Sequence, residues 1–321
     1  MTLRSVILGS AAMAALLSGS LFLSPYVLAD DQESLTEKLE KAKSSVPQVE
    51  FELRYKFTPG ETIKTQVVHV ATTETKIKGN TQTSKSRAVS TKVWKIDAVH
   101  EDGSITFTHS VENVEMWQQV TDRPEVRYDS RTDEEAPPEY EGVQETIGVP
   151  LATITIDRLG NVVKREGGSQ RQASLGLGDI AVPLPAGQVK LGHEWNAADE
   201  VFVRLANGQS KRINVRKHFT LDKVQTGVAT ISVRTQVLTP TQDPQILAQL
   251  AQQLTNGTIR FDVDAGRLLS RQMDWDETVV GFNGADSMLQ YLARYTEELQ
   301  EVTTGAKAKT AAKPAGPELR R

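Results

Sequence analysis

The chain has 321 residues, a formal net charge of −4 and no cysteine. The absence of cysteine excludes disulfide bonds, thiolate catalysis and cysteine-ligated metal sites. A mildly acidic balance gives no general attraction to nucleic acid, so we expect no nucleic-acid partner.

Residues 1–29 have the three parts of a secretory signal peptide. Arg4 supplies a positive start, residues 6–23 carry no charge, and Val27-Leu28-Ala29 places small or apolar residues where a signal peptidase cuts. We predict cleavage between Ala29 and Asp30, and export to the periplasm or the extracellular space. The alternative is an uncleaved anchor, but that needs ~20 strongly apolar residues, and Gly and Ser dilute this stretch. No later segment is apolar enough to suggest a membrane span after cleavage.

The chain after the signal peptide is expected to be mainly β. Residues 30–48 have apolar residues at helical spacing and predict a short helix and linker. From Val49 onward, β-branched residues alternate with polar ones between Gly- and Asn-containing turns, which is typical of antiparallel hairpins with one solvated face. Expected strands cover residues 61–78, 81–97, 104–117, 151–157, 162–165 and 268–282. The acidic, proline-containing stretch 122–141 is expected to be a solvated loop.

The order of features recurs along the chain, which predicts two diverged β repeats. Pro59-Gly60-Glu61 opens the first repeat and Leu191-Gly192-His193 opens the second. Later, Thr153–Asp157 matches Thr258–Asp262, and a glycine-containing turn follows each. We place the first repeat at 49–168, a Gly- and Pro-rich linker at 169–188, the second repeat at 189–302 and a disordered tail at 303–321.

Two segments depart from the strand pattern. Residues 244–254 carry an apolar stripe at helical spacing and predict a helix that covers a sheet face. Residues 284–302 fit either a helix or a strand, and the Asn283-Gly284 hairpin turn favours the strand, with Leu289, Tyr291, Ala293 and Tyr295 on one face. The expected fold class is therefore mainly β, a β-rich α+β arrangement of antiparallel sheets. The two repeats would form twisted sheets or half-barrels with one or two short helices.

No catalytic, cofactor-binding or metal-binding residues are predicted. The five histidines lack the helical i, i+4 spacing of a zinc protease. His100 and His109 flank an expected hairpin that would bring them near each other, but scattered strand histidines are more often structural or exposed than metal ligands. The stretch from Asp262 to Gly266 begins like a calcium loop, but its fifth and twelfth positions are Gly266 and Met273, so it fails as one. No phosphate-binding loop or nucleophile elbow is present.

The motifs Phe57–Glu61, Leu191–Trp195 and Thr258–Asp262, with Gly266–Leu269, resemble an uncharacterised family of exported, β-rich bacterial proteins. The resemblance covers roughly residues 49–300. It implies export and a β-rich body. Because no activity is assigned to the family, it supplies no site residues.

Two functions are consistent with these observations. The first is an exported, non-enzymatic envelope or periplasmic protein with a β-sheet binding or scaffolding role. Its specific form is a lipophilic-ligand carrier with a pocket of ~300–1,000 Å³, and its partner would be a lipophilic ligand or an envelope protein. The alternative is a carboxylate-dependent hydrolase of an extracellular polymer, in which Asp262, Asp274 and Asp276 would converge in a cleft.

Overall fold

The computed structural model describes residues 49–167 and 180–304. The expected signal peptide with its Ala29–Asp30 cleavage site, the expected helix and linker at 30–48, and the tail from residue 305 lie outside the described residues. Most of the expected linker, residues 169–179, does so too.

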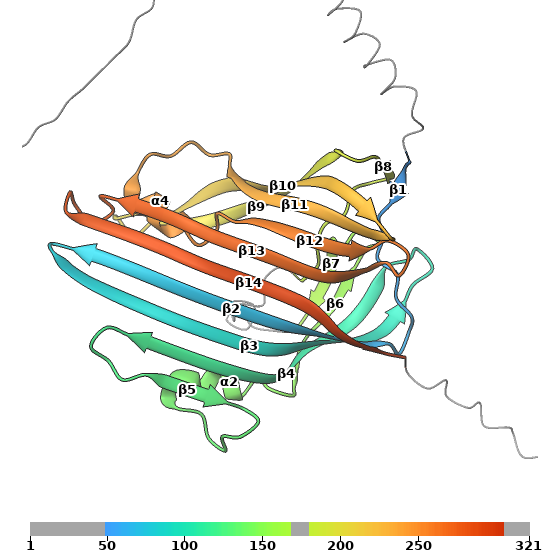
Figure 1. The fold of residues 1–321 in the computed structure, drawn as a ribbon, viewed down its shortest axis with the longest axis horizontal. Helices are drawn as coiled ribbons and strands as arrows, with labels where there is room; N and C mark the ends of the chain where they lie inside the picture. Colours follow the sequence, from blue (N-terminus) through green and yellow to red (C-terminus); the bar gives the residue numbers. More distant parts are fainter. Residues whose placement is uncertain (1–48, 168–179, 305–321) are drawn as a thin grey trace, which may run out of the picture. The chain divides into compact units, whose positions relative to one another are not determined.

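The described chain is built mostly from antiparallel β-strands, which confirms the expected fold class (Figure 1). One sheet has twelve strands and a second has two, β1 and β8. Two short α-helices accompany them, α2 (Glu141–Gln144) and α4 (Pro244–Leu250), with a 3-10 turn η1 (Pro138–Tyr140) before α2. The strands are β1 (Phe51–Glu52), β2 (Thr62–Ile77), β3 (Asn80–Val99), β4 (Ile105–Val120), β5 (Val126–Asp129), β6 (Pro150–Ile156), β7 (Val162–Glu166), β8 (Gln188–Val189), β9 (Glu194–Arg204), β10 (Ser210–Gln225), β11 (Val228–Val237), β12 (Asn256–Asp262), β13 (Arg267–Val280) and β14 (Ser287–Thr303).

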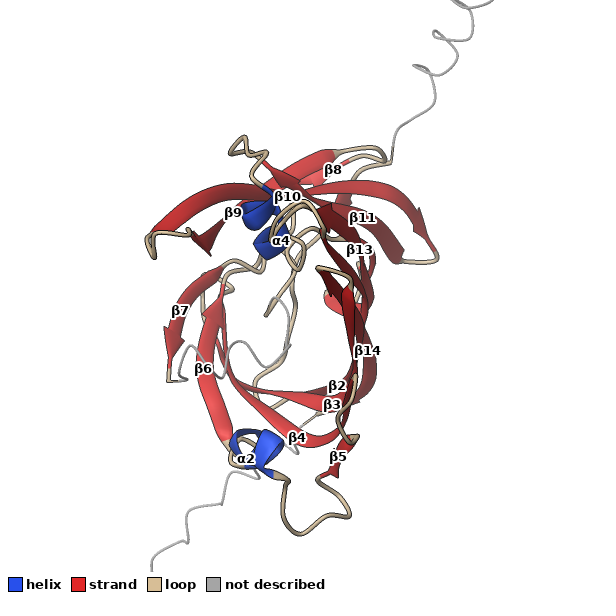
Figure 2. Cartoon of the chain, turned by 90° about the vertical axis from the view of Figure 1, so that its left-hand side faces the viewer, coloured by secondary structure: helices blue, strands red, loops and turns tan. Residues whose placement is uncertain are grey.

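The strand order divides the large sheet into two five-stranded meanders joined by β14. The order is β7-β6-β4-β3-β2-β14-β13-β12-β11-β10-β9, with β5 added beside β4. In each meander a helical segment interrupts the chain between the third and fourth strands: η1 and α2 in the first, α4 in the second. The sheet curls so that β6 lies opposite β14 (Figure 2), and its outermost strands β7 and β9 are not paired with each other. We call the enclosed side of this sheet the inner face.

The opening motifs of the two expected repeats make the same backbone contacts. Gly60 N–H donates to Ile96 O at 2.8 Å, and Ile96 N–H donates to Glu61 O at 2.8 Å. In the second meander, Gly192 N–H donates to Leu221 O at 2.8 Å and Leu221 N–H to His193 O at 3.0 Å. Each motif thus fixes the start of one meander against the second strand of that meander.

Two hairpins show why the local sequence folds as it does. Lys78 and Gly79 link β2 to β3 with φ of 49° and 84°, and Thr226 and Gly227 link β10 to β11 with φ of 49° and 77°. Positive φ at both loop residues gives the turn twist that matches flanking antiparallel strands, and glycine adopts it without strain.

A short segment crosses one end of the inner face and fastens both meanders. We call residues 51–57 the strap. Tyr55 N–H donates to Arg158 O in the turn after β6, and Lys56 N–H donates to Gly266 O in the turn after β12, both at 2.9 Å. Tyr55 and Leu53 are buried in the main hydrophobic core, which takes side chains from both meanders. Residues 180–189 complete that core, because Ala181, Val182, Leu184 and Val189 are buried in it.

Two of the ambiguous or coarse predictions are resolved by the strands and helices observed. Residues 287–303 form strand β14, so the strand interpretation of 284–302 is confirmed. The expected helix at 244–254 is α4, which begins at Pro244 after Asp243, whose side chain accepts from Gln245 N–H. Ile246 and Leu250 of α4 pack against the β9–β10 hairpin, so the helix does cover a sheet face.

The stretch 122–141 differs from the expected solvated loop. It contains β5, which pairs with β4, and it buries Tyr128 and Tyr140 in a second cluster with Val111 and Val114. The acidic residues and prolines dominate its composition, and the two tyrosines that anchor it are too few to produce a periodic signal.

Candidate functional site

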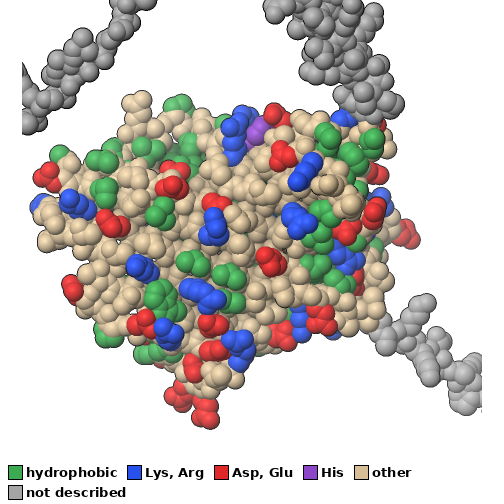
Figure 3. Space-filling model, in the orientation of Figure 1, with side chains coloured by type: hydrophobic (Ala, Val, Ile, Leu, Met, Phe, Trp, Pro, Cys, Tyr) green, Lys and Arg blue, Asp and Glu red, His purple; other side chains and the backbone are tan. Residues whose placement is uncertain are grey.

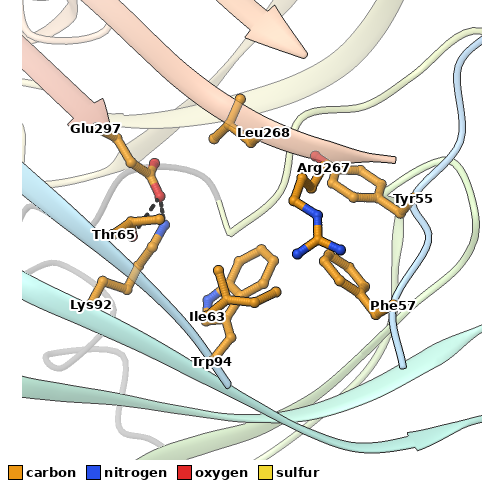
Figure 4. A pocket seen from close by; sticks show the side chains of 9 residues that line it. All are labelled: Tyr55, Phe57, Ile63, Thr65, Lys92, Trp94, Arg267, Leu268 and Glu297. Atoms are coloured by element: carbon orange, nitrogen blue, oxygen red, sulfur yellow. Dashed lines mark hydrogen bonds and ion pairs between the residues drawn. The ribbon is translucent and has the colours of Figure 1, made fainter. Parts of the chain in front are cut away.

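A pocket lies on the inner face where the strap, both meanders and β14 meet (Figure 4). We call it the central pocket. Its lining is mainly apolar and aromatic, with three charged side chains among it: Tyr55, Phe57, Ile63, Thr65, Lys92, Trp94, Arg267, Leu268 and Glu297.

An ionic cluster forms one wall of the central pocket. Glu297 on β14 is 1% exposed, Lys92 on β3 is 2% exposed and Arg271 on β13 is 5% exposed. Lys92 forms an ion pair with Glu297 Oε1, and Arg271 Nε lies 2.7 Å from Glu297 Oε2. One carboxylate therefore bridges two cations, each on a strand of a different meander.

Neutral hydroxyls complete the coordination of Glu297. Thr65 donates to Glu297 Oε1 at 3.2 Å, Tyr295 donates to Glu297 Oε2 at 3.1 Å, and Arg271 Nη2 donates to the Tyr295 hydroxyl at 3.0 Å. With both oxygens bonded, Glu297 is held in one position.

The pKa values follow from burial and from these partners. Burial alone would raise the pKa of Glu297, but Arg271 and Lys92 hold it at about 2. Burial lowers the pKa of Lys92, against the opposing attraction of Glu297. Burial raises the pKa of Tyr295, so its hydroxyl remains a neutral donor.

A second ion pair closes the strap side of the central pocket. Arg267 Nη1 lies 2.7 Å from Glu61 Oε1, and Glu61 is 3% exposed. The other oxygen of Glu61 accepts from Thr58 N–H at 3.1 Å. This pair joins the loop before β2 to the start of β13, again across the two meanders.

A second apolar pocket adjoins the central pocket along the inner face of β3. We call it the second pocket, and it lies partly under α2, lined by Ala88, Val89, Ser90, Val111, Val114, Met116, Val143 and Thr146. Ala88, Ser90, Lys92 and Trp94 alternate along β3 and so point to the same face. Lys92 therefore stands at the boundary between the two pockets.

Both pockets are narrow. The free volume is about 20 Å³ in the central pocket and about 40 Å³ in the second pocket. These volumes hold single water molecules, whereas a lipid needs ~300 Å³ or more. A lipid chain can enter only when side chains such as Phe57 and Leu268, which are half-buried, move apart.

The residues considered from the sequence are not brought together. Asp262 accepts from Ala265 N–H within its own turn, whereas Asp274 lies at the far end of the β12–β13 register and pairs with Arg294. Asp276 is exposed on the outer face. The three carboxylates therefore share no cleft.

The two hairpin histidines differ in burial and in their neighbours. His109 is 1% exposed and sits in the inner row of β4 opposite Trp94, whereas exposed His100 bonds Thr106 at 2.8 Å. In residues 49–167 and 180–304, no group of three or more His, Asp or Glu side chains is arranged to hold a metal ion.

Sequence reasoning missed Lys92, Arg271 and Glu297, although one signal was present. Glu297 follows Tyr291, Ala293 and Tyr295 at the same alternating spacing, so the strand pattern already places it on the inner row. Charged residues on an otherwise apolar row are candidates for a buried cluster. The partners of Glu297, however, lie on strands that only the fold brings together.

Acidic and basic side chains are interspersed over the face shown in Figure 3, with hydrophobic side chains in small separate groups between them. No helix in the described part of the chain is long and apolar enough to cross a membrane.

No protein-family model matches the chain, and no curated protein matches its sequence. Among solved structures, it is similar to lipovitellin, in a structure concerned with lipid–protein interactions, with 10% identity, 80% of this chain and 27% of that chain covered, and a TM-score of 0.41. It is also similar to the translocator domain of autotransporter NalP from Neisseria meningitidis, with 7% identity, 86% and 99% covered, and a TM-score of 0.28. The chain spans about a quarter of the lipovitellin chain's length. At these identities and TM-scores the likeness assigns no function.

Proposed function

We propose that this protein is an exported, non-enzymatic binding protein of the bacterial cell envelope that holds a lipophilic ligand against the inner face of its sheet. Export rests on the features of residues 1–29, and the bacterial envelope on the resemblance of residues 49–300 to an exported β-rich family.

The observation that carries the proposal is the placement of a buried ionic cluster between two apolar pockets. Removing charges from water costs several kcal/mol for each ion, and a well-packed apolar replacement is often equally stable. Lys92, Arg271 and Glu297 are all at most 5% exposed, in the middle of an apolar inner face. Such a cluster at the junction of two pockets is typical of a binding site.

The proposal includes an opening motion, because the pockets admit only water in this conformation. Tyr55 and Phe57 belong to the strap, while Arg267 and Leu268 begin β13. The strap backbone makes one hydrogen bond to each meander, to Arg158 O and to Gly266 O. The Lys56 ammonium group adds hydrogen bonds to Val263 O and Asp264 O. Displacing this segment widens the central pocket without breaking strand pairs of the large sheet.

Native mass spectrometry of the protein purified from its own cell envelope tests the proposal. We expect a bound species of a few hundred daltons that disappears after extraction with organic solvent. The extracted protein should then enhance the fluorescence of N-phenyl-1-naphthylamine, an uncharged apolar probe. A purified protein with neither bound species nor probe binding would contradict ligand binding, and a co-purifying protein would instead indicate a scaffolding role.

A further inference from the structure

Lys92 shares its counter-charge at the central pocket. Arg267 pairs with Glu61, whereas Lys92 pairs with Glu297, whose carboxylate also contacts Arg271. Lys92 is only 2% exposed, so water does little to stabilise its charge. A further anion next to Lys92 would therefore stabilise the site.

A second donor faces the same pocket. The indole N–H of Trp94 is buried and has no hydrogen-bond acceptor in residues 49–167 and 180–304. Trp94 and Lys92 are both on the inner row of β3 and both line the central pocket (Figure 4). Buried N–H donors are nearly always paired in native proteins. An anionic oxygen beside Lys92 is the kind of acceptor that would pair this one.

The remaining walls select against a small, fully hydrated anion. Tyr55, Phe57, Ile63 and Leu268 supply apolar surface around the two donors. A free phosphate or acetate would lose its water on entry and gain no polar contact from these walls. An acyl or alkyl chain attached to the anion would contact them favourably.

We infer that the ligand is a single-chain amphiphile with an anionic head group, which binds Lys92 and the Trp94 indole N–H while its chain lies against the apolar walls of the central pocket. This inference rests on the proposed function and specifies the ligand class. One chain is favoured over two because the pocket is narrow.

Competition with N-phenyl-1-naphthylamine tests the head group. Oleate should displace the probe at a concentration about tenfold lower than oleyl alcohol, because only oleate can form a hydrogen bond with Lys92 in which both partners are charged. Oleyl phosphate should behave like oleate, whereas sodium acetate and inorganic phosphate should not displace the probe at millimolar concentration.

Two variants locate the effect at Lys92. Lys92→Met should remove the preference for oleate over oleyl alcohol, because it removes the cation that contacts the head group. Lys92→Arg should keep the preference. Lys95→Met is the matched control, because Lys95 is exposed on the same strand, and it should bind both ligands like the parent protein.

The possible failures can be told apart. Equal displacement by oleate and oleyl alcohol in the parent protein would overturn the anionic head group and leave the proposed function intact. Displacement by acetate or phosphate alone would overturn the amphiphile. If the probe itself does not bind, the proposed function fails. The comparison in the parent protein decides the head group even if Lys92→Met does not fold.

Discussion

Each cation at the central pocket lies over an aromatic ring. Lys92 Nζ is 5.1 Å from the Trp94 ring centroid, and Arg271 Cζ is 5.0 Å from that of Tyr295. Arg267 Cζ lies 6.0 Å from the Phe57 ring. Cation–π contacts of this kind contribute ~0.5–2 kcal/mol each, so the aromatic side chains offset part of the cost of burying charge. The same rings form the apolar walls, which is why charged and apolar surfaces coexist in so small a site.

His109 is the residue that makes this region sensitive to acid. Burial and the nearby charge of Lys92 lower the pKa of His109 from 6.5 to about 4. Two other charged groups have smaller effects on this pKa: Arg165 lowers it and Glu297 raises it. Between these two pH values His109 is neutral in the folded protein and protonated in the unfolded chain. The free energy of unfolding therefore falls as the pH falls from 6.5 to about 4.

A His109→Gln variant should lack that dependence. The predicted loss in the parent protein is roughly 3 kcal/mol across this interval, measured by urea unfolding at pH 7, 6, 5 and 4. Other groups titrate in both proteins, so the quantity to compare is the difference in free energy of unfolding between parent and variant. This difference should change steadily as the pH falls, because only the parent loses stability through His109. His100→Gln, an exposed histidine of the same hairpin, is the control and should follow the parent curve. If the free energy of unfolding falls with pH equally in His109→Gln and in the parent, His109 is not the cause of the acid sensitivity.

The two outermost strands of the sheet, β7 and β9, each leave one edge without a strand partner within the large sheet. Strand β9 carries two features that oppose pairing with another chain. Gln249 of α4 accepts from Arg204 N–H at 2.7 Å and donates to Arg204 O at 2.8 Å, so its amide occupies the end of the edge. Asp199 is exposed but sits on the inner row, opposite buried Val215. An inward-pointing charge on an edge strand disfavours edge-to-edge association.

Replacing this charge should allow the protein to associate. We expect Asp199→Val to form dimers or larger species at micromolar concentration, detected by sedimentation velocity, while the parent stays monodisperse. Asp276→Val makes the same chemical change on β13, whose two edges are both paired, and should leave sedimentation unchanged. Association of both variants to the same extent would point to general loss of charge rather than to the edge.

The positions of strands and helices were predicted from the sequence better than the pairing between strands. Alternation identified β2, β3, β4, β6 and β13, because each has one apolar face that the core requires. Strand β7, whose five residues are all exposed, was predicted instead from the turn that precedes it. The apolar stripe of α4 was equally visible. The Asn283-Gly284 turn predicted that β13 pairs with β14, and this is confirmed. The rest of the strand order was not visible, because β14 also pairs with β2 and nothing local in residues 287–303 specifies that neighbour. For the same reason the sequence could show that Glu297 lies on an inner row, but could not bring it to Lys92.

At the scale of the whole molecule, the strap ties corresponding turns of the two meanders together. Asp157 and Asp262 shape these turns in the same way, by accepting backbone N–H groups from Leu159 and Ala265. Each turn then contains a glycine with positive φ, Gly160 at 83° and Gly266 at 64°. The strap passes so close to both that neither position has room for a side chain.

Substitution of Gly160 should therefore loosen the strap and with it the central pocket. A Cβ there would lie 2.6 Å from Tyr55 Cε2 and 2.6 Å from Val182 O. Gly160→Ala then combines left-handed backbone strain of ~1–2 kcal/mol with an overpacking cost of ~1–3 kcal/mol. The control is Gly208→Ala, because Gly208 has φ of 82° and nothing within 4 Å of the added Cβ, so it carries only the backbone strain.

We expect Gly160→Ala to unfold at lower urea concentration than Gly208→Ala. Hydrogen exchange should also increase at residues 53–57 and at the turn around Gly266, since the strap is bonded to both meanders. Equal destabilisation by the two variants, or faster exchange confined to the turn around Gly160, would show that the strap does not couple the meanders.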